Sequence, residues 1–349
     1  MNLLRFPGER AIDLICLGRA GVDLYAQQAD TPLEQVQGFR KSVGGSPANV
    51  ATGAARLGLR AAMLSVVSDD GFGRYVRQFL ADNKVDVRGL RTDDSGSLNS
   101  VAFTEMRPEG CQVIIYRRNA ADLQLRVADI DPRAIADARA LLVTGTALSA
   151  SPSREAAFHA MRLARQAGTV VVLDLDYRPY GWTGAHEASV TLGLAGSLSD
   201  LVIGNREEFT VLGGAASSGA VQAEPHAWTE PHARALLRDA AQAVVVKDGP
   251  RGCRVILRDG AVIEQGIFPV RARKPFGSGD AFAAALLWAL IGQRPWQEAL
   301  RWGAAAAAIN VSGDACAEAM PTLSQLRAFV EAYPPATPSS AQAPKEPFP

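Results

Sequence analysis

Hydrophobic and polar positions follow two alternating patterns along most of this chain. Short, nearly continuous apolar runs are typical of buried strands, and they alternate with longer stretches of helical periodicity. The strand-like runs are residues 11–17, 61–67, 140–143, 170–174, 201–203 and 243–246. The stretches that predict helices include residues 47–57, 73–83, 154–167 and 231–240. This order predicts an α/β fold with a mainly parallel central sheet, right-handed crossovers and helices on both faces.

Two segments depart from this alternation, because residues 25–43 and 100–116 contain no helical pattern of useful length. In the second segment, VAFTEM and CQVIIY flank residues 107–110, which predicts a β-hairpin. Strands outside the parallel sheet are candidates for a small separate sheet over the ligand crevice, which could act as a lid. We therefore expect one domain, residues 10–333, with a discontinuous β lid formed by residues 20–43 and 98–118.

Two further segments lack apolar periodicity. Residues 334–349 are rich in proline, alanine and serine, which predicts a disordered tail. Residues 215–228 are a second weak segment, for which we expect a mobile surface loop.

Composition narrows the class of protein. Lysine plus arginine and aspartate plus glutamate number 36 each, so no global field recruits nucleic acid or an anionic membrane. No apolar run approaches the roughly 20 residues of a membrane span, and the N-terminus lacks a signal-peptide core, which predicts a cytoplasmic protein. Four separate cysteines and four histidines without ligand spacing argue against a structural zinc site.

The most informative motif is KPFGSGDAFAAALL, residues 274–287. Gly277 and Gly279 flank Ser278 and permit a turn whose N–H groups converge on one anion at a helix N-terminus. Asp280 would repel a bound phosphate, but it suits a base that takes a proton from an attacking hydroxyl. An ordinary glycine turn with Asp280 as N-cap is the alternative.

A second glycine turn, GGSPAN, also enters a predicted helix. Gly44 and Gly45 would let a substrate lie against the main chain, and Asn49 could donate to and accept from a sugar hydroxyl. Asp23 follows the first strand, where a carboxylate could accept two hydroxyl protons from a polyol. The alternatives are a capped helix and a turn aspartate.

Three more polar motifs follow predicted strands. In KDGPRG, Lys247 is followed by Gly249 and Gly252, which leave space for a nucleotide base or phosphate. In NREE, Asn205 and Glu208 could face a phosphate with its magnesium, or could form a capping box.

In DLDYR, Arg178 could clamp a carboxylate or phosphate, or could simply be solvated. All of these motifs lie beyond the carboxyl ends of predicted parallel strands, the edge where open α/β sheets bind ligands. Neither GxxxxGK[ST] nor an opening GxGxxG is present, which weakens P-loop and nicotinamide-dehydrogenase interpretations.

Two of these motifs carry a family resemblance. VGGSPANVATGAARLG resembles the first signature of the ribokinase-like, or PfkB, family of carbohydrate kinases, and KPFGSGDAFAAALL resembles the second. The resemblance extends over residues 12–330. It implies a three-layer, ribokinase-like α/β sandwich with a β lid, and phosphorylation of a sugar-like hydroxyl by ATP with Mg²⁺.

Lid strands with exposed apolar faces often pair across a two-fold axis, so we expect a weakly held homodimer formed through the lid. The resemblance also implies roles for individual residues. Asp280 would be the catalytic base, with anion-hole amides from Gly277, Ser278 and Gly279. The implied substrate contacts are Asp23, Gly44, Gly45 and Asn49. The implied ATP contacts are Asn205, Glu208, Lys247, Gly249 and Gly252, with Glu208 acting on magnesium indirectly.

The motif departs from many relatives at Lys274. Those relatives have aspartate at this position, followed by threonine, and the aspartate usually contributes to a monovalent-cation site. Activation by K⁺ is therefore open for this chain, although backbone carbonyls and Ser312 could still contribute ligands.

Further stretches resemble PfkB kinases of keto-deoxy sugar acids: ICLGRAGVDLYAQQ, IIYRRNAAD, LLVTGTALS, DLDYRPYGW and AMPT. The implied acceptor is the primary hydroxyl of 5-dehydro-2-deoxy-D-gluconate in myo-inositol catabolism, with 2-keto-3-deoxygluconate or a sugar such as fructose as alternatives. Arg117 and Arg178 could both reach the acid's carboxylate, or Arg117 or Arg118 could pair with a surface acid. A catalytically weak sugar or nucleotide sensor is the alternative class, but a pure binder needs no base such as Asp280.

Overall fold

A computed structural model of the protein describes residues 4–107, 110–214, 229–274 and 276–335. Its largest element is a nine-stranded sheet of order β13-β12-β11-β10-β9-β8-β1-β4-β5. The strands are β1 Ile12–Leu17, β4 Ala61–Val67, β5 Leu90–Thr92, β8 Ala138–Thr144, β9 Val170–Asp174, β10 Leu201–Asn205, β11 Ala243–Lys247, β12 Cys253–Leu257 and β13 Val262–Gln265. The strands from β11 to β5 pair in parallel, and β12 and β13 add an antiparallel hairpin at one edge.

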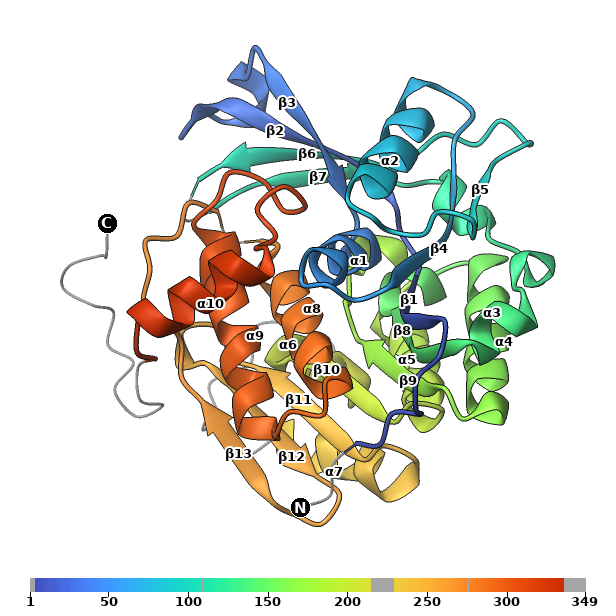
Figure 1. Ribbon diagram of the computed structural model, residues 1–349. Coiled ribbons are helices and arrows are strands. Elements are labelled where there is room, and N and C mark those ends of the chain that lie inside the picture. The colour runs from blue at the N-terminus through green and yellow to red at the C-terminus, as the bar shows by residue number, and fades with distance from the viewer. Residues whose placement is uncertain (1–3, 108–109, 215–228, 275, 336–349) are drawn as a thin grey trace.

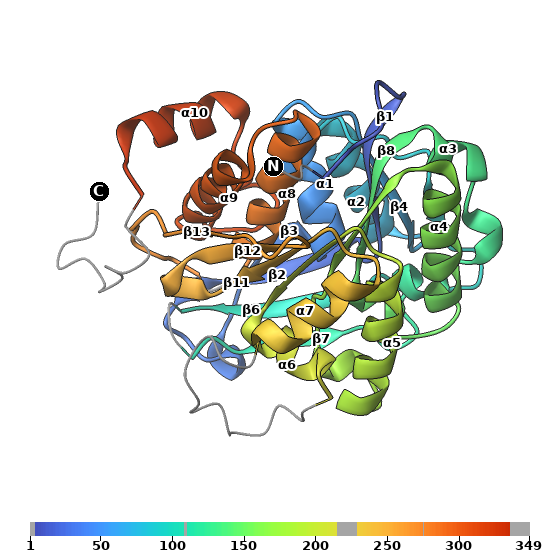
Figure 2. The same ribbon diagram turned by 90° about the horizontal axis from the view of Figure 1, so that it is seen from below.

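Helices cover both faces of this sheet, so the core has three layers (Figures 1 and 2). The helices on one face are α1 Ser46–Arg56, α2 Gly71–Asp82, α8 Ser278–Ile291 and α9 Trp296–Val311, with α10 Leu323–Ala332 packed on α9. Those on the other face are α3 Pro132–Ala136, α4 Ser153–Ala167, α5 Ala185–Ser197, α6 Arg206–Leu212 and α7 Thr229–Asp239.

Each hydrophobic strand contributes side chains to the cores on both faces of the sheet, because its residues point alternately to one face and the other. In β8, Ala140 and Leu142 pack into the cluster on the α1 and α8 face, whereas Leu141 and Val143 pack into the cluster on the α4 and α5 face. Successive side chains of a strand point to opposite faces, so a continuous apolar run is what a sheet covered on both sides requires.

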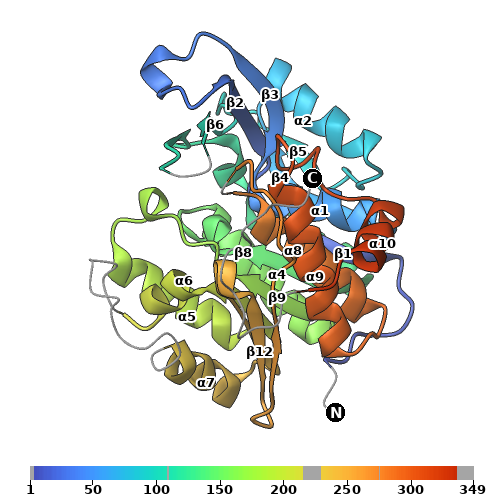
Figure 3. The same ribbon diagram turned by 90° about the vertical axis from the view of Figure 1, so that its left-hand side faces the viewer.

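A separate four-stranded sheet of order β3-β2-β6-β7 forms the lid. Its strands are β2 Gly21–Ala29, β3 Phe39–Gly44, β6 Val101–Met106 and β7 Val113–Tyr116. Figures 1 and 3 show it standing apart from the large sheet, above the start of α1. The hairpin predicted for residues 100–116 is present as the antiparallel pair β6–β7, and β2 joins β6 in parallel.

The predicted fold class is therefore confirmed. The sequence patterns did not identify the β12–β13 hairpin or helices α9 and α10. Residues 215–228 and 336–349, for which we predicted a mobile loop and most of a disordered tail, lie outside the described residues. No helix in the described part of the chain is both long and apolar enough to cross a lipid bilayer.

Candidate active site

One cavity of about 500 Å³ opens at the carboxyl ends of β1, β8, β9, β10 and β11. The side chains that follow these strands and line it include Arg19, Thr146, Asp174, Asp176, Arg178, Asn205, Glu208 and Lys247. The starts of α1 and α8 contribute Gly45, Ser46, Asn49, Gly277, Ser278, Gly279 and Asp280. Lid strands β6 and β7 contribute Ala102, Thr104, Val113 and Ile115, so the lid covers the cavity.

Asp280 lies in the first turn of α8, and both of its carboxylate oxygens accept hydrogen bonds from α1. Ser46 donates its hydroxyl to Oδ1 at 2.5 Å, and the amide of Asn49 donates to Oδ2 at 2.8 Å. Burial in the cleft, and then the charge of Asp176, raise the pKa of Asp280 to about 6, against the lowering effect of these two hydrogen bonds. A carboxylate with a pKa this close to neutrality suits a general base.

The turn before Asp280 has the geometry of an anion site. Gly277 is the N-cap of α8 with φ of +85°, which a side chain would disfavour. A Cβ at Gly277 would lie 2.5 Å from Sγ of Cys316, so the site also leaves no space for one. The first N–H groups of a helix have no partner within it, so those of Ser278, Gly279 and Asp280 are available to a negatively charged group.

Asp23 lies in β2 at the other side of the cavity and is fixed by two donors. Nη2 of Arg19 and the hydroxyl of Tyr25 lie 3.1 and 3.2 Å from its carboxylate oxygens. A Cβ on Gly44 would lie 1.9 Å from Oδ1 of Asp23, so this glycine makes room for the carboxylate and does not itself line the cavity. Arg19 is a site residue that the sequence analysis missed, although it directly follows the first strand, as the other candidates follow theirs.

Asn49, whose amide nitrogen donates to Asp280, also offers a free acceptor. Its Oδ1 is buried and has no hydrogen-bond donor among the described residues. A buried polar atom without a partner is costly, and a substrate hydroxyl would satisfy it. This observation supports the predicted sugar contact.

Lys247, at the end of β11, and Asp174, at the end of β9, form an ion pair across the end of β10, with Nζ 3.1 and 3.3 Å from the two carboxylate oxygens. Burial would lower the pKa of Lys247, but Asp174 and Glu208 raise it above its ordinary value, so the lysine is a fixed cation. A Cβ on Gly279 would lie 3.4 Å from this Nζ. The ammonium therefore lies beside the first turn of α8, where it adds positive charge to the anion site.

Asn205 and Glu208 form the capping box that was the alternative for NREE. The Asn205 side chain accepts from the backbone N–H of Glu208 at 2.9 Å, and Glu208 accepts from that of Asn205 at 2.7 Å. Both residues nevertheless line the cavity. Burial raises the pKa of Glu208 to about 7, with Lys247 opposing the shift.

Of the two glycines of KDGPRG, one lines the cavity and the other does not. Gly249, with φ of +53°, lines the cavity. A Cβ on Gly249 would have no other atom within 4 Å, so there is open space beside this residue. Gly252 does not line the cavity. A Cβ on it would lie 2.1 Å from the carbonyl oxygen of Gln265, so this glycine serves the β12–β13 edge instead of a nucleotide.

Arg178 reaches the cavity and Arg117 does not. Arg178 is half exposed, with Nη2 2.9 Å from Oδ1 of Asp176. Arg117 is buried, and its Nε donates to Asp122 at 2.9 Å while Nη1 donates to the carbonyl of Thr146 at 3.0 Å. The expectation that Arg117 could reach a substrate carboxylate does not fit this geometry, because its guanidinium is already engaged by a buried acid.

The charges of the cavity favour a divalent cation. The described lining residues carry five carboxylates, on Asp23, Asp174, Asp176, Glu208 and Asp280, against three cations, on Arg19, Arg178 and Lys247. No group of three or more metal-binding side chains exists among the residues that the structure describes. Magnesium that arrives on ATP needs only one or two protein carboxylates beside phosphates and water, so the residues at the Glu208 end fit it.

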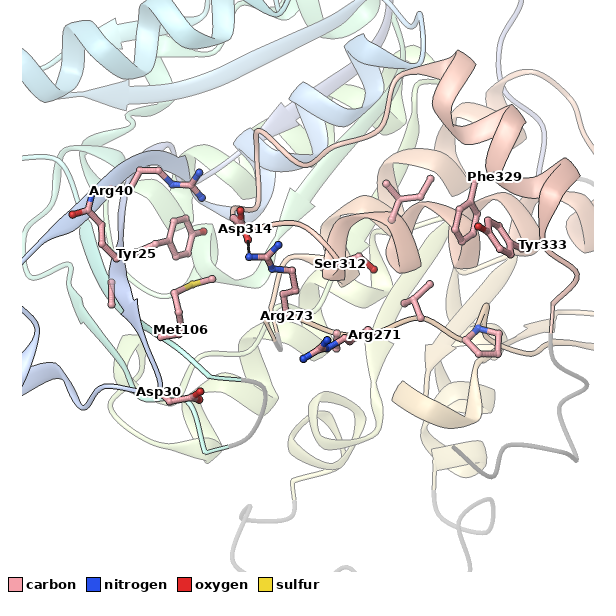
Figure 4. A pocket seen from close by; sticks show the side chains of 17 residues that line it. Tyr25, Asp30, Arg40, Met106, Arg271, Arg273, Ser312, Asp314, Phe329 and Tyr333 are labelled. Atoms are coloured by element: carbon pink, nitrogen blue, oxygen red, sulfur yellow. Dashed lines mark ion pairs between the residues drawn. The ribbon is translucent and has the colours of Figure 1, made fainter. Parts of the chain in front are cut away.

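A larger cavity of about 1220 Å³ lies between the lid and α9–α10 (Figure 4). Tyr25 lines it and stacks on Phe276, which lines the first cavity, with ring centroids 5.7 Å apart. The stacked rings therefore separate the two spaces. Arg273 pairs with Asp314 at 2.8 Å in this second cavity. Since Asp280 and the anion turn face the first cavity, we assign the chemistry there.

An α/β sheet with a carboxylate at an anion-binding helix N-terminus, beneath a β lid, defines a class of phosphoryl-transfer enzyme. The model of the pfkB family of carbohydrate kinases matches residues 11–323. This chain therefore belongs to the PfkB family of carbohydrate kinases.

Similar sequences within that family are named for one substrate. A 5-dehydro-2-deoxygluconokinase of Photobacterium profundum is 48% identical over 331 residues, covering 95% of this chain and 98% of that protein. A 5-dehydro-2-deoxygluconokinase of Geobacillus kaustophilus is 41% identical, with 95% of this chain and 98% of that protein covered.

Solved structures of sugar kinases share the fold. A fructokinase from Xylella fastidiosa with bound ATP is 26% identical with a TM-score of 0.80, covering 92% of this chain and 98% of that one. A fructokinase from Vibrio cholerae, in a form that binds fructose, ADP and a potassium ion, is 27% identical with a TM-score of 0.78, covering 93% and 99% of the two chains.

Proposed function

We propose that this chain transfers the γ-phosphoryl group of MgATP to the primary hydroxyl of 5-dehydro-2-deoxy-D-gluconate. The observation that carries the proposal is the position of Asp280, in the first turn of α8 with both carboxylate oxygens held by α1. The relatives named for this acceptor, at 40–48% identity over nearly the whole chain, support the choice of sugar acid.

In this mechanism Asp280 accepts the proton of the acceptor hydroxyl as it attacks the phosphorus in line with the leaving oxygen. The backbone N–H groups of the turn at Gly277–Asp280 and the ammonium of Lys247 hold the charge that develops on the transferred group. Magnesium neutralises the ATP phosphates when it is bound, with Glu208 as its indirect protein partner. Asp23 and Asn49 orient the acceptor through its other hydroxyls.

Arg178 is the proposed partner of the acceptor's carboxylate. Its guanidinium faces the cavity, and an arginine can hold a carboxylate with two parallel hydrogen bonds. Closure of the lid over the acceptor would exclude water and so limit hydrolysis of ATP.

We also propose that the protein is a homodimer formed through the lid. Leu98, Ile114 and Tyr116 expose 69%, 36% and 66% of their surface on or beside the lid strands. Apolar side chains exposed together favour burial against a second copy of the same surface.

The acceptor is tested by a coupled ADP-release screen of 5-dehydro-2-deoxygluconate, 2-keto-3-deoxygluconate, fructose, ribose and inositol. The expected result is the highest kcat/KM with 5-dehydro-2-deoxygluconate. Faster turnover of fructose or ribose than of both acids would contradict the Arg178 argument. Sugar and ATP binding by calorimetry without ADP release would support the sensor instead.

A further inference from the structure

Lys274 is completely buried, with 0% of its surface exposed, at the start of the segment that leads into α8. Its Nζ donates to three oxygens: the carbonyl of Phe276 at 2.9 Å, and the carbonyl and Oδ1 of Asn310 at 2.8 and 2.7 Å. An ammonium group has three N–H donors, so these acceptors match it completely. None of the three is a carboxylate, although a buried lysine is normally paired with an acid.

The position of these oxygens explains why a cation is favourable there. Asn310 lies in the last turn of α9, whose final carbonyls have no partners within the helix and form the negative end of its dipole. The ammonium of Lys274 supplies a positive charge at that helix end. A shell of carbonyl and amide oxygens is also the environment that hard cations prefer.

The same contacts connect Lys274 to the anion site. A Cβ on Gly277 would lie 2.8 Å from Oδ1 of Asn310, so this amide packs directly beneath the turn. The Nδ2 of Asn310 donates to the carbonyl of Cys316 at 2.8 Å, which fixes the amide's orientation. The oxygens that surround the ammonium therefore determine where the backbone of Gly277 lies.

A second connection leads to the substrate side. Phe276, whose carbonyl accepts from Lys274, stacks on Tyr25 with an angle of 3° between the rings, and the Tyr25 hydroxyl contacts Asp23. A shift of the Phe276 backbone would thus disturb both the anion-binding turn and the carboxylate of Asp23, which faces the substrate side of the cavity.

We propose that the ammonium of Lys274 is a built-in monovalent cation, which holds the Phe276–Gly277 turn in its anion-binding shape and makes this kinase independent of potassium. The Vibrio cholerae fructokinase was solved with a potassium ion. A free monovalent cation does not fit among the oxygens around Lys274, because the ammonium is already bonded to all three. The kinetic part of this inference rests on the proposed phosphoryl transfer, and its thermal part does not.

The first test compares the wild-type protein in KCl, NaCl and choline chloride at equal ionic strength. We expect kcat to agree within about twofold in the three salts, and the Tm to be the same in KCl and NaCl. Activation of the wild type several-fold by potassium over sodium would overturn the proposal, and this arm needs no variant that has to fold.

The second test uses Lys274→Ala, which removes the ammonium and opens a space of its size. We expect kcat to fall by about 10²-fold, as for a misplaced anion site, and ammonium, methylammonium or potassium to restore about tenfold of it. Tetramethylammonium is too large to enter and should restore nothing. The Tm of this variant should rise with ammonium or potassium, whereas the wild-type Tm should not.

Lys84→Asn is the matched control. Lys84 follows the end of α2 with φ of +64°, a conformation that asparagine tolerates, so the change removes a lysine charge away from the turn. It should keep wild-type activity and show no response to cations.

A folded Lys274→Ala protein whose lost activity and stability no small cation restores would show that Lys274 only fills space. An error in the chosen acceptor would abolish turnover in every salt but leave the cation dependence of the Tm intact.

Discussion

The hydroxyl of Ser46 lies 2.5 Å from Oδ1 of Asp280 and donates a hydrogen bond to it. The bond joins the first turn of α1 to the first turn of α8, which are 234 positions apart in the chain. The two glycine-rich motifs of the sequence thus meet as one site. Because a hydrogen bond to an ionised carboxylate stabilises its charged form, Ser46 also sets the pH range in which Asp280 can accept a proton.

This relationship predicts a pH profile. Asp280 acts as a base only when it is deprotonated, so kcat/KM should be constant above its pKa of about 6 and fall as the pH drops below that value. Ser46→Ala removes a donor to the charged form, so the pKa should rise by about one unit. The acid limb of kcat/KM should then move to higher pH, and an unchanged limb in a folded variant would contradict the assignment of this limb to Asp280.

Arg178 should determine the preference for an acid acceptor. In Arg178→Met the KM for 5-dehydro-2-deoxygluconate should rise about 10- to 100-fold, the loss expected for one charged hydrogen-bonded contact. The KM for MgATP should change little. Arg118→Met, which removes an exposed lid arginine, is the control and should behave as the wild type. An equal rise in KM for neutral fructose would show that Arg178 does not recognise the carboxylate.

Arg117 should affect stability more than catalysis. Its Nη2 and Nε both donate to Asp122, whose side chain has 0% exposure, so Arg117→Met would leave a buried carboxylate unpaired. Breaking such a pair costs about 3–5 kcal/mol. Thermal unfolding should show a clearly lower Tm, and residual folded enzyme should keep a nearly normal KM. A raised KM with an unchanged Tm would instead show that Arg117 contacts the substrate.

The lid surface should control the oligomeric state. Val113 and Ile115 of β7 line the cavity. Because successive side chains of a strand point to opposite faces, Ile114 and Tyr116 lie on the other face of the lid. Ile114→Asp would place a charge on the proposed interface, so sedimentation should detect a monomer in place of the wild-type dimer. Leu194→Asp, an exposed apolar position on α5, is the control that should remain dimeric.

The sequence predicted the fold well where periodicity was strong. The strand patterns at residues 170–174 and 243–246 match β9 and β11 closely, since continuous apolar runs are required by a sheet covered on both faces. Helices α9 and α10 were not identified. The alanine-rich α9 has apolar residues around most of its circumference, which gives no single face for a periodicity argument to detect.

The site was predicted in part, for a physical reason. Residues that directly follow parallel strands must meet at one sheet edge, so Asn205 and Lys247 could be placed together from their positions alone. Whether a side chain is free or already paired depends on partners distant in sequence. For this reason Arg117 was assigned to the substrate. Gly252 was assigned to the nucleotide because the close approach of Gln265 to this glycine is not visible in the sequence.

The central claim is that Asp280 is the base that activates the acceptor hydroxyl, and Asp280→Asn tests it most directly. Asparagine keeps the size of the side chain and the N-terminal turn of α8, so the Tm and the affinity for MgATP should stay close to those of the wild type. The measurement is kcat in the ADP-release assay with 5-dehydro-2-deoxygluconate at saturating MgATP. We predict a decrease of roughly 10² to 10⁴-fold, the contribution of a general base, whereas near-normal turnover in a folded Asp280→Asn protein would contradict the account.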